Sequence, residues 1–390
     1  RATPRCASVW TPWPGGCSGR ERRTAGVVKV DGRHYRSIWP GDDGRSVHVI
    51  DQTRLPHAFE TLRLERRAEV EHAIRTMQVR GAPLIGASAA YGVCLQMRAD
   101  ASDAALDDAC ASLLATRPTA VDLRHFLDAM RAALAPLSPA ARAAAAWERA
   151  GALADASAGA CRAIGEHGLK LVERIREGRP DGEPVNVLTH CNAGWLATVD
   201  WGTALAPIYL AHDRGIPVHV WVDETRPRHQ GAGLTAWELA GHGVPHTVIA
   251  DGAAGHLMQR GRVQLVLTGT DRTTAAGDVC NKIGTYPAAL AARDNGVPFW
   301  VALPATSLDR SLRDGIAEIP IEERDPDEVH RVRGRDPAGR VVAVRITPEA
   351  SPAANFAFDV TPARLVSGFV TEHGLCDATA EALARTHDRS

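Results

Sequence analysis

A cysteine and an aspartate with acid–base potential follow apolar runs in the second half of the chain. Cys191 comes after the apolar run 185–189, and Asp271 comes after the apolar run 263–268. A thiol and a carboxyl group can both exchange protons with a substrate once their surroundings tune their pKa values. Each residue also has a simpler interpretation, because a cysteine after a strand is commonly a packing residue and an aspartate before a helix commonly caps it. Spacing alone therefore leaves both readings open.

The neighbouring residues suggest how the two pKa values could be tuned. Trp195 and Trp201 lie close to Cys191 in the sequence, and we expect burial against such apolar side chains to raise the pKa of Asp271. We expect a helix N-terminus after the strand to lower the pKa of the Cys191 thiol.

A repeated strand–helix pattern positions these residues. Five runs, VNVLTH, VHVWVDE, HTVIAD, VQLVLTGTD and FWVALP, each precede a helical segment, which predicts a parallel sheet covered by helices. In such a sheet, ligands bind beyond the carboxyl ends of the strands. The ends of the first four runs are polar and comprise His190, Cys191, Asn192, Asp223, Glu224, Thr225, Arg226, Asp251, Gly269, Thr270, Asp271 and Arg272.

The first half of the chain has a different pattern. Residues 28–57 alternate in polarity around DG and PGDDG turns and predict a small antiparallel sheet, while residues from about 58 to 178 have helical spacing. The Pro- and Gly-rich segment 176–184 marks a boundary, so we predict a 28–178 domain and a Rossmann-like α/β domain over 179–390. Residues 1–27 lack periodicity and are interpreted as an ill-ordered extension.

The end of the chain and the bulk composition complete this outline. Within NFAFDVTPARLVSGFVTEHG we expect a last short strand and then a helix with Thr361 as its N-cap and Pro362 at its first position. With 390 residues and a formal net charge of −1, the chain has no basic excess to hold nucleic acid. Eight scattered cysteines and no apolar run of about 20 residues favour a cytoplasmic protein that does not bind membranes.

Other motifs bear on anions, dinucleotides and metals. Arg80 and Gly81 precede an Ala- and Gly-rich helix whose free N–H groups suit a phosphate, although Gly86 is better explained by tight helix packing. The segment GAGLTA at 231–236 follows a polar run instead of a strand, so a dinucleotide fingerprint is disfavoured. The spacing of the histidines near residues 242–256 is that of surface residues, and no metal site is predicted.

Taken together, the motifs resemble those of the S-methyl-5-thioribose-1-phosphate isomerases, aldose–ketose isomerases of methionine salvage. The resemblance spans roughly residues 36–375 and rests on MQVRGAPLIGASAAYG, RPTAVDLRH, LTHCNAGWLAT, VDETRPRHQGAGLTAWEL, GTDRTTAAGDVCNKIGTY and IPIEERDPDEV. It implies a small N-terminal sheet with a helical domain, a Rossmann-like domain, a homodimer and no cofactor. It also implies catalytic Cys191 and Asp271, with substrate contacts at Arg80, Gly81, Ala82, Arg117, Gln230, Asn281 and Lys282.

Two departures from the family pattern concern substrate preference. Gly233 stands where the resemblance leads us to expect arginine, and residues 270–273 read TDRT where ADRI is common. Related enzymes that act on 5-deoxyribose 1-phosphate or ribose 1,5-bisphosphate therefore remain alternatives. A non-catalytic subunit like those of the translation-initiation exchange factor is a further alternative, although such subunits tend to lack the Cys and Asp pair. For the isomerase we expect Asp271 to assist ring opening and Cys191 to serve transfer of hydrogen from C2 to C1.

Overall fold

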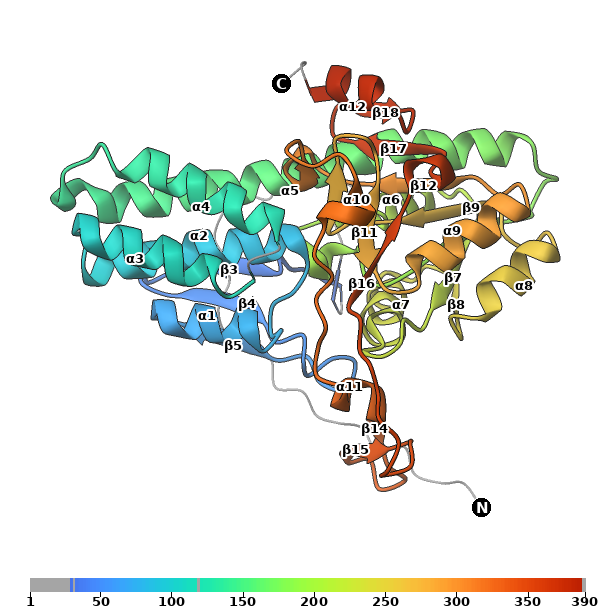
Figure 1. Cartoon of the computed structure of the whole chain (residues 1–390), viewed down its shortest axis with the longest axis horizontal. Coiled ribbons are helices and arrows are strands. Elements are labelled where there is room, and N and C mark those ends of the chain that lie inside the picture. Colours follow the sequence, from blue (N-terminus) through green and yellow to red (C-terminus); the bar gives the residue numbers. More distant parts are fainter. Residues whose placement is uncertain (1–28, 31, 118–119, 388–390) are drawn as a thin grey trace.

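The computed structural model describes residues 29–30, 32–117 and 120–387 of the chain. The predicted extension 1–27 lies outside the described residues. Figure 1 shows a helical part on one side and an α/β part on the other, with a hairpin projecting from the α/β part. Among the described residues, no helix has both the length and the apolar character needed to cross a membrane.

The predicted N-terminal antiparallel sheet is present, but it extends further along the chain than expected. It consists of β3 (Ile38–Pro40), β4 (Val47–Ile50) and β5 (Thr61–Leu64), and a separate small pair joins β1 (Lys29–Val30) to β2 (Arg33–His34). The prediction that helices begin at about residue 58 was wrong for β5. The segment TLRL alternates between exposed and more buried side chains, which suits an edge strand paired with β4.

Five helices follow the sheet and build the helical part. They are α1 (Arg67–Arg75), α2 (Ala82–Ala99), α3 (Asp103–Leu114), α4 (Val121–Leu134) and α5 (Pro139–Glu177). Helix α2 is buried on nearly all sides at the centre of this group. A Cβ atom at Gly86 would approach the Phe126 ring to 2.6 Å, which confirms that this glycine permits close packing between α2 and α4.

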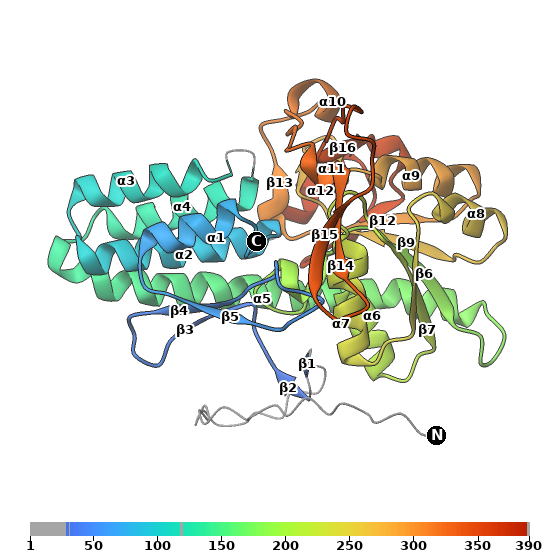
Figure 2. The same ribbon diagram turned by 90° about the horizontal axis from the view of Figure 1, so that it is seen from below.

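Helix α5 joins the two parts of the molecule. Figure 2 shows it running from the helical part along the base of the α/β part. Its N-terminal half contacts α2 and α4, while its C-terminal half packs against α6 (Ala206–Asp213). Gly165 and Gly168 allow this approach, because a Cβ at either position would come within 3.0 Å of Ala206 or Pro207. The α/β part is therefore fixed to the helical part by a continuous core.

The five predicted strands of the α/β part are confirmed and form a parallel sheet. They are β6 (Val185–Thr189), β7 (Val218–Asp223), β8 (His246–Ile249), β9 (Leu265–Thr268) and β12 (Phe299–Ala302). The helices between them include α6, α7 (Ala236–His242), α8 (Ala253–Gln259) and α9 (Thr285–Asp294). The sheet order is β18-β17-β12-β9-β6-β7-β8. From β6 the chain adds β7 and β8 on one side, and from β9 it adds β12 and β17 on the other side, so the direction of strand addition changes between β6 and β9. Polar residues that follow β6 and β9 consequently share a crevice.

The expected helix after Thr361 is wrong. Thr361 ends a strand, β16 (Phe358–Thr361), and only a short turn, η4 (Ala363–Leu365), follows before β17 (Gly368–Thr371). The segment GFVT is buried throughout and pairs in parallel with β12, and β18 (Gly374–Cys376) pairs antiparallel beyond it. Burial on both faces of the sheet favours the strand over the capped helix that the local Thr-Pro pattern suggests.

Short strands from distant segments form a second sheet that the sequence did not indicate. Its order is β13 (Leu308–Asp309), β10 (Arg272–Thr274), β11 (Val279–Lys282) and β16. The projecting hairpin consists of β14 (Arg331–Arg335) and β15 (Val341–Arg345). The remaining short elements are η1 (Trp195–Ala197), η2 (Gly231–Thr235), η3 (Ala305–Ser307), α10 (Gly315–Glu318), α11 (Asp327–His330) and α12 (Ala380–His387).

Candidate active site

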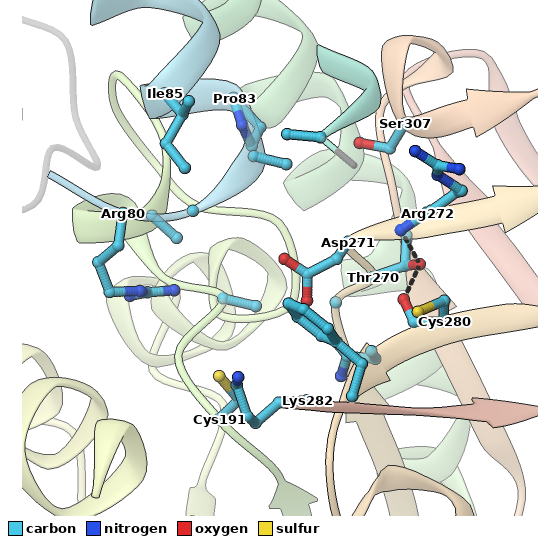
Figure 3. A pocket seen from close by; sticks show the side chains of 18 of the residues that line it. Arg80, Pro83, Ile85, Cys191, Thr270, Asp271, Arg272, Cys280, Lys282 and Ser307 are labelled. Carbon is cyan, nitrogen blue, oxygen red and sulfur yellow. Dashed lines mark hydrogen bonds between the residues drawn. The ribbon is translucent and has the colours of Figure 1, made fainter. Parts of the chain in front are cut away.

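A cavity of about 80 Å³ lies where the helical part, the parallel sheet and the second sheet meet. Figure 3 shows side chains from all three converging on it. The sequence-predicted site residues all line this cavity, although they are spread over some two hundred positions of the chain: Arg80, Gly81, Ala82, Arg117, Cys191, Gln230, Asp271, Asn281 and Lys282. The fold thus brings the predicted set together.

Cys191 follows β6 directly and has a left-handed backbone with φ of 65°. Its N–H group donates a hydrogen bond to Thr225 Oγ1 at 2.8 Å. Burial raises the pKa of the thiol, and the positive charges of Arg80 and Lys282 oppose that shift. The expected helix N-terminus is absent, because only the short η1 turn follows, so the prediction of a lowered thiol pKa was wrong. The sulfur is therefore held mainly as a neutral thiol beside two cations.

Asp271 lies just after β9, in the turn that leads into β10. Its N–H group donates to the Cys280 carbonyl at 3.0 Å, which ties the turn to β11. Figure 3 shows its carboxyl group directed into the cavity that Cys191 also lines. The expected contact with Trp195 and Trp201 was wrong, since both indoles belong to the main core instead of the cavity wall.

The apolar part of the cavity wall comes from other elements than the predicted tryptophans. It comprises Met77, Pro83, Ile85, Ala120, Pro304, Ile319, Pro320 and Phe358. Pro83 and Ile85 belong to α2, so the helical part closes one side of the cavity (Figure 3). The cavity therefore combines an apolar wall with charged groups, of which Arg80 and Lys282 are buried.

Three of the predicted cations reach the cavity from different elements. Arg80 precedes α2 and is 8% exposed, Arg117 follows α3, and Lys282 ends β11. Lys282 donates to the Ala357 carbonyl at 2.8 Å and lies 4.3 Å from the centre of the Phe358 ring. Burial lowers the pKa of this lysine, while Cys191 and Asp271 oppose the shift. Arg117 Nη2 lies 3.6 Å from Glu322 Oε2, and Arg117 Nε has no hydrogen-bond partner among the described residues.

The start of α2 has the backbone geometry predicted for an anion site. Gly81 has φ of 91°, and Ala82 is the first residue of the helix. A Cβ atom at Gly81 would lie 2.3 Å from the Ala197 carbonyl oxygen, so only glycine fits between α2 and η1. Gly81, Ala82 and Pro83 all line the cavity wall, and since Pro83 has no N–H group, Ala82 is the first residue of α2 that offers a backbone donor there.

The two predicted amide side chains contribute polar atoms to the wall. Asn281 donates to Thr285 Oγ1 at 3.0 Å, which leaves its carbonyl oxygen available. Gln230 is 3% exposed, and its Oε1 atom has no hydrogen-bond partner among the described residues. A buried acceptor without a partner is costly, so a hydroxyl group of a ligand is a fitting partner.

His190, Asp223 and Asp251, which the sequence marked only as polar strand ends without a specific role, form a further group at the cavity. His190 Nδ1 lies 2.9 Å from Asp223 Oδ2, and His190 Nε2 donates to the Ile283 carbonyl at 2.8 Å. Together with Asp251 they form a group with metal-ligating atoms within 4.8 Å of one another. Both Asp251 oxygens already accept N–H groups, from Thr225 and Arg226, so we interpret the group as a hydrogen-bonded network.

A second cavity, of about 380 Å³, adjoins the first and shares Met77, Arg80 and Gln230 with it. The β14–β15 hairpin forms one side of this second cavity. Arg333 and Arg335 of the hairpin donate to the carbonyl oxygens of Thr53 and His57, both at 2.5 Å. These two hydrogen bonds hold the β14–β15 hairpin against residues 53–57, beside the first cavity.

The described architecture is that of a Rossmann-like α/β protein with a polar cavity at the switch point of its sheet. Residues 78–378 match the sequence profile of the Initiation factor 2 subunit family. A methylthioribose-1-phosphate isomerase of Rhodospirillum rubrum is 62% identical, with coverage of 92% of this chain and 93% of the relative. One of Methylorubrum extorquens is 61% identical, with coverage of 92% and 97%.

Solved structures support the same relationship. The 5-methylthioribose 1-phosphate isomerase from Pyrococcus horikoshii OT3 has a TM-score of 0.79 and 35% identity, and the match covers 95% of this chain and 99% of that one. The translation initiation factor eIF-2B, subunit delta, from A. fulgidus has a TM-score of 0.74 and 35% identity, with coverage of 91% and 99%. This chain belongs to the Initiation factor 2 subunit family and, among its members, to the methylthioribose-1-phosphate isomerases.

Proposed function

We propose that this chain converts S-methyl-5-thio-α-D-ribose 1-phosphate to S-methyl-5-thio-D-ribulose 1-phosphate, with Cys191 and Asp271 as its acid–base pair. The observation that carries the assignment of the pair is that thiol and carboxyl group line one small cavity. The other charged groups of that wall, among the described residues, are the cationic side chains of Arg80, Arg117, Arg272 and Lys282, with His190 beside them. The cationic side chains of this cavity suit the phosphate group of a sugar phosphate, and its single carboxyl group can exchange protons with the sugar.

The reaction begins with ring opening, because the 1-phosphate locks the anomeric carbon as an acetal. Asp271 donates a proton to the ring oxygen as the bond between that oxygen and C1 breaks. The hydrogen on C2 then moves to C1, and the C2 hydroxyl group loses its proton as the C2 carbonyl forms. The Asp271 carboxylate left by ring opening is the final acceptor of this proton. Cys191 relays it, because the thiol gives its own proton to Asp271 as the sulfur takes the one from the C2 hydroxyl, and both groups line the same cavity.

Arg80, Arg117 and Lys282 neutralise the phosphate in this scheme. An arginine can contact two phosphate oxygens at once, whereas a lysine acts as a point charge. The N–H group of Ala82, the first residue of α2, adds a donor of the same polarity. Gln230 Oε1 and the amide of Asn281 contact sugar hydroxyl groups. Fixing the charge and the sugar in one geometry supplies much of the rate enhancement.

The second cavity bears on the choice of the 5-substituent. A ribose 1,5-bisphosphate isomerase needs a free basic cluster for the second phosphate. Arg228 is paired with Glu328, and Arg331 with Asp327, so these two arginines of the second cavity wall are neutralised. Arg333 of the same wall donates to the Thr53 carbonyl, and one arginine is not a basic cluster. Apolar wall residues such as Leu55 and Leu234 suit a methylthio group better. Turnover of methylthioribose 1-phosphate, 5-deoxyribose 1-phosphate and ribose 1,5-bisphosphate by the purified protein compares the three substrates directly.

Two substitutions test the acid–base pair. Cys191→Ala and Asp271→Asn should each lower kcat by roughly 10²- to 10⁴-fold, the usual contribution of a positioned proton donor or acceptor. Binding of the sugar phosphate, measured by calorimetry, should change little, because neither residue holds the phosphate in this scheme. Near-normal turnover in both variants would remove the pair from the mechanism. No turnover of any of these sugar phosphates by the unmodified chain would instead favour the alternative of a non-catalytic binding subunit.

The quaternary structure and location complete the proposal. The family resemblance favours a homodimer, and light scattering on the purified chain measures its mass in solution. A cytoplasmic location agrees with the buried cysteines of the described residues, which are free thiols: Cys94, Cys110, Cys161, Cys191 and Cys280.

A further inference from the structure

Glu238 of α7 is a buried carboxylate that does not line the cavity. It is 1% exposed and accepts four hydrogen bonds. The donors are Asn192 Nδ2 at 2.9 Å, the N–H groups of Trp195 and Leu196 at 3.0 Å each, and the Tyr209 hydroxyl at 2.7 Å. Burial raises the pKa of this carboxyl group, and its four donors oppose the shift. Such complete satisfaction fixes the carboxylate in one orientation.

The contact with Glu238 decides which way the amide of Asn192 points. Asn192 Nδ2 donates to Glu238 Oε1 and, at 3.2 Å, to Thr235 Oγ1. An amide has its two donors on one atom and its acceptors on the other, so the Asn192 Oδ1 atom must face the opposite way. The Glu238 carboxylate, on one side of the Asn192 amide, therefore fixes the direction of the Oδ1 acceptor on its other side.

That acceptor holds Arg80, which does line the cavity. Arg80 Nη1 donates to Asn192 Oδ1 at 2.5 Å, and Arg80 Nη2 donates to the Asn192 backbone carbonyl at 2.8 Å. Two bonds from the two ends of one planar guanidinium fix both its position and its plane. Figure 3 shows the extended Arg80 side chain at the cavity wall.

We propose that Glu238 is a positioning residue which, through the amide of Asn192, aims the Arg80 guanidinium at the phosphate group of the substrate. The inference rests on the proposed function, in which Arg80 binds phosphate. Glu238 touches neither substrate nor reacting atoms. Its negative charge also offsets the positive charge of the buried Arg80 guanidinium, from which the Asn192 side chain separates it. Gly194 permits the arrangement, because a Cβ there would lie 1.8 Å from Glu238 Oε2.

A purely structural role for Glu238 is the competing explanation, because the carboxylate also holds the N–H groups of η1. Tyr209→Phe is the matched control, since it removes one donor from Glu238 and leaves Asn192 and Arg80 untouched. The readout is inhibition by inorganic phosphate, together with KM and kcat measured separately. Poor folding alone lowers the active fraction and hence kcat, and it leaves the phosphate inhibition constant unchanged.

Glu238→Gln should raise KM and the inhibition constant of inorganic phosphate by the same factor, about tenfold, while kcat changes by less than about threefold. Asn192→Ala, which leaves Glu238 with its η1 contacts, should raise both constants at least as much. Tyr209→Phe should leave both within about twofold. Equal effects of Glu238→Gln and Tyr209→Phe on phosphate inhibition would overturn the proposal.

A reciprocal pair tests the polarity of the contact. In the double variant Asn192→Asp with Glu238→Gln, the glutamine amide donates to the new carboxylate, whose other oxygen still accepts from Arg80. The bond from the Leu196 N–H to the same end of residue 238 is lost, so the recovery is partial. The double variant should recover at least half of the loss in phosphate binding on a logarithmic scale, whereas Asn192→Asp alone should not improve binding. Losses that simply add would contradict the proposal, and this comparison still holds if Glu238→Gln alone fails to fold.

The variant Arg80→Met separates this inference from the proposed function. If phosphate inhibition weakens in Arg80→Met and not in Glu238→Gln, Arg80 binds phosphate without help from Glu238 and the inference falls. If Arg80→Met leaves phosphate inhibition unchanged, the assignment of Arg80 in the proposed function falls as well.

Discussion

The backbone N–H of Cys191 and the hydroxyl group of Thr225 form a hydrogen bond of 2.8 Å. The same hydroxyl donates to the Asp223 carbonyl at 3.0 Å, so a single side chain links the carboxyl ends of β6 and β7. Both Cys191 and Thr225 have positive φ angles, of 65° and 63°. The thiol is therefore directed into the cavity by a backbone conformation that its neighbour on the next strand supports.

Replacing the hydroxyl of Thr225 should disturb this conformation. Thr225→Val keeps the shape of the side chain and removes both hydrogen bonds, and we expect kcat to fall by roughly 10- to 100-fold because the thiol shifts. Thr225→Ser keeps the hydroxyl and relieves β-branching at a positive φ, so its kcat should stay within about threefold of the original. Steady-state rates of the two variants provide the measurement. Equal rates would show that the hydrogen bond does not position Cys191.

The reactivity of Cys191 toward alkylating agents should report its buried, neutral state. Burial raises its pKa, so the thiolate fraction at pH 7 is smaller than that of an ordinary cysteine. We expect slow labelling by iodoacetamide at pH 7, an increase toward pH 9, and protection by inorganic phosphate. Cys376, which is more exposed, is the internal reference in a peptide-resolved mass measurement. Faster labelling of Cys191 than of Cys376 at pH 7 would contradict a raised pKa.

The pair of His190 and Asp223 should make stability depend on pH. Burial raises the pKa of Asp223 to about 6. Burial lowers the pKa of His190, but the hydrogen bond to Asp223 and the negative charge of Asp223 raise it by more, so the net shift is upward. A raised histidine pKa stabilises the fold below the unfolded value of 6.5, and this stabilisation is lost as the pH rises through the folded value. We expect the free energy of unfolding to fall above pH 6.5, by at most about 1.4 kcal/mol per pH unit for one proton.

The variant Asp223→Asn is the comparison for this pH effect. An amide at residue 223 can still bond to neutral His190, but it carries no charge to retain the proton. Its free energy of unfolding should vary less between pH 6.5 and 8.5 than that of the unmodified chain, as followed by urea titration. Parallel curves for the two proteins would rule the pair out as the source.

The strands of the parallel sheet could be predicted because each is a local apolar run, such as 185–189, with a turn on either side. The second sheet could not be predicted in this way. Its strands are two to four residues long, and β11 pairs with β16, which lies far along the chain, from Val279 opposite Thr361. Short strands paired over such distances leave no periodic signal.

The residues of the candidate site also divide into those that the sequence predicts and those that only the folded structure reveals. Cys191 and Asp271 could be nominated because they follow apolar strands, and the other predicted residues followed from the family resemblance. Glu238 could not be nominated, because within TAWELAGH it reads as a polar residue of a surface helix. Only the packing of α7 against η1 shows that this carboxylate is buried and fully hydrogen-bonded.

Gly81 offers a test of how tightly the start of α2 must fit against η1. Gly81→Ala places a Cβ 2.3 Å from the Ala197 carbonyl oxygen at a φ of 91°, so either the helix or η1 must move. Gly44→Ala is the control, since Gly44 also has a positive φ, of 60°, but faces open space. Backbone strain alone costs about 1–3 kcal/mol, and both variants should lose that much stability.

The two glycine variants should differ in substrate binding. Gly81→Ala displaces the N–H groups at the start of α2 and the adjacent Arg80, so KM for the sugar phosphate should rise at least about tenfold. Gly44→Ala should keep the original KM, because its strain lies far from the cavity wall. Thermal denaturation and steady-state kinetics on both proteins separate the two effects. An unchanged KM in Gly81→Ala would mean that the start of α2 does not contact the substrate, and the phosphate would then be bound by side chains alone.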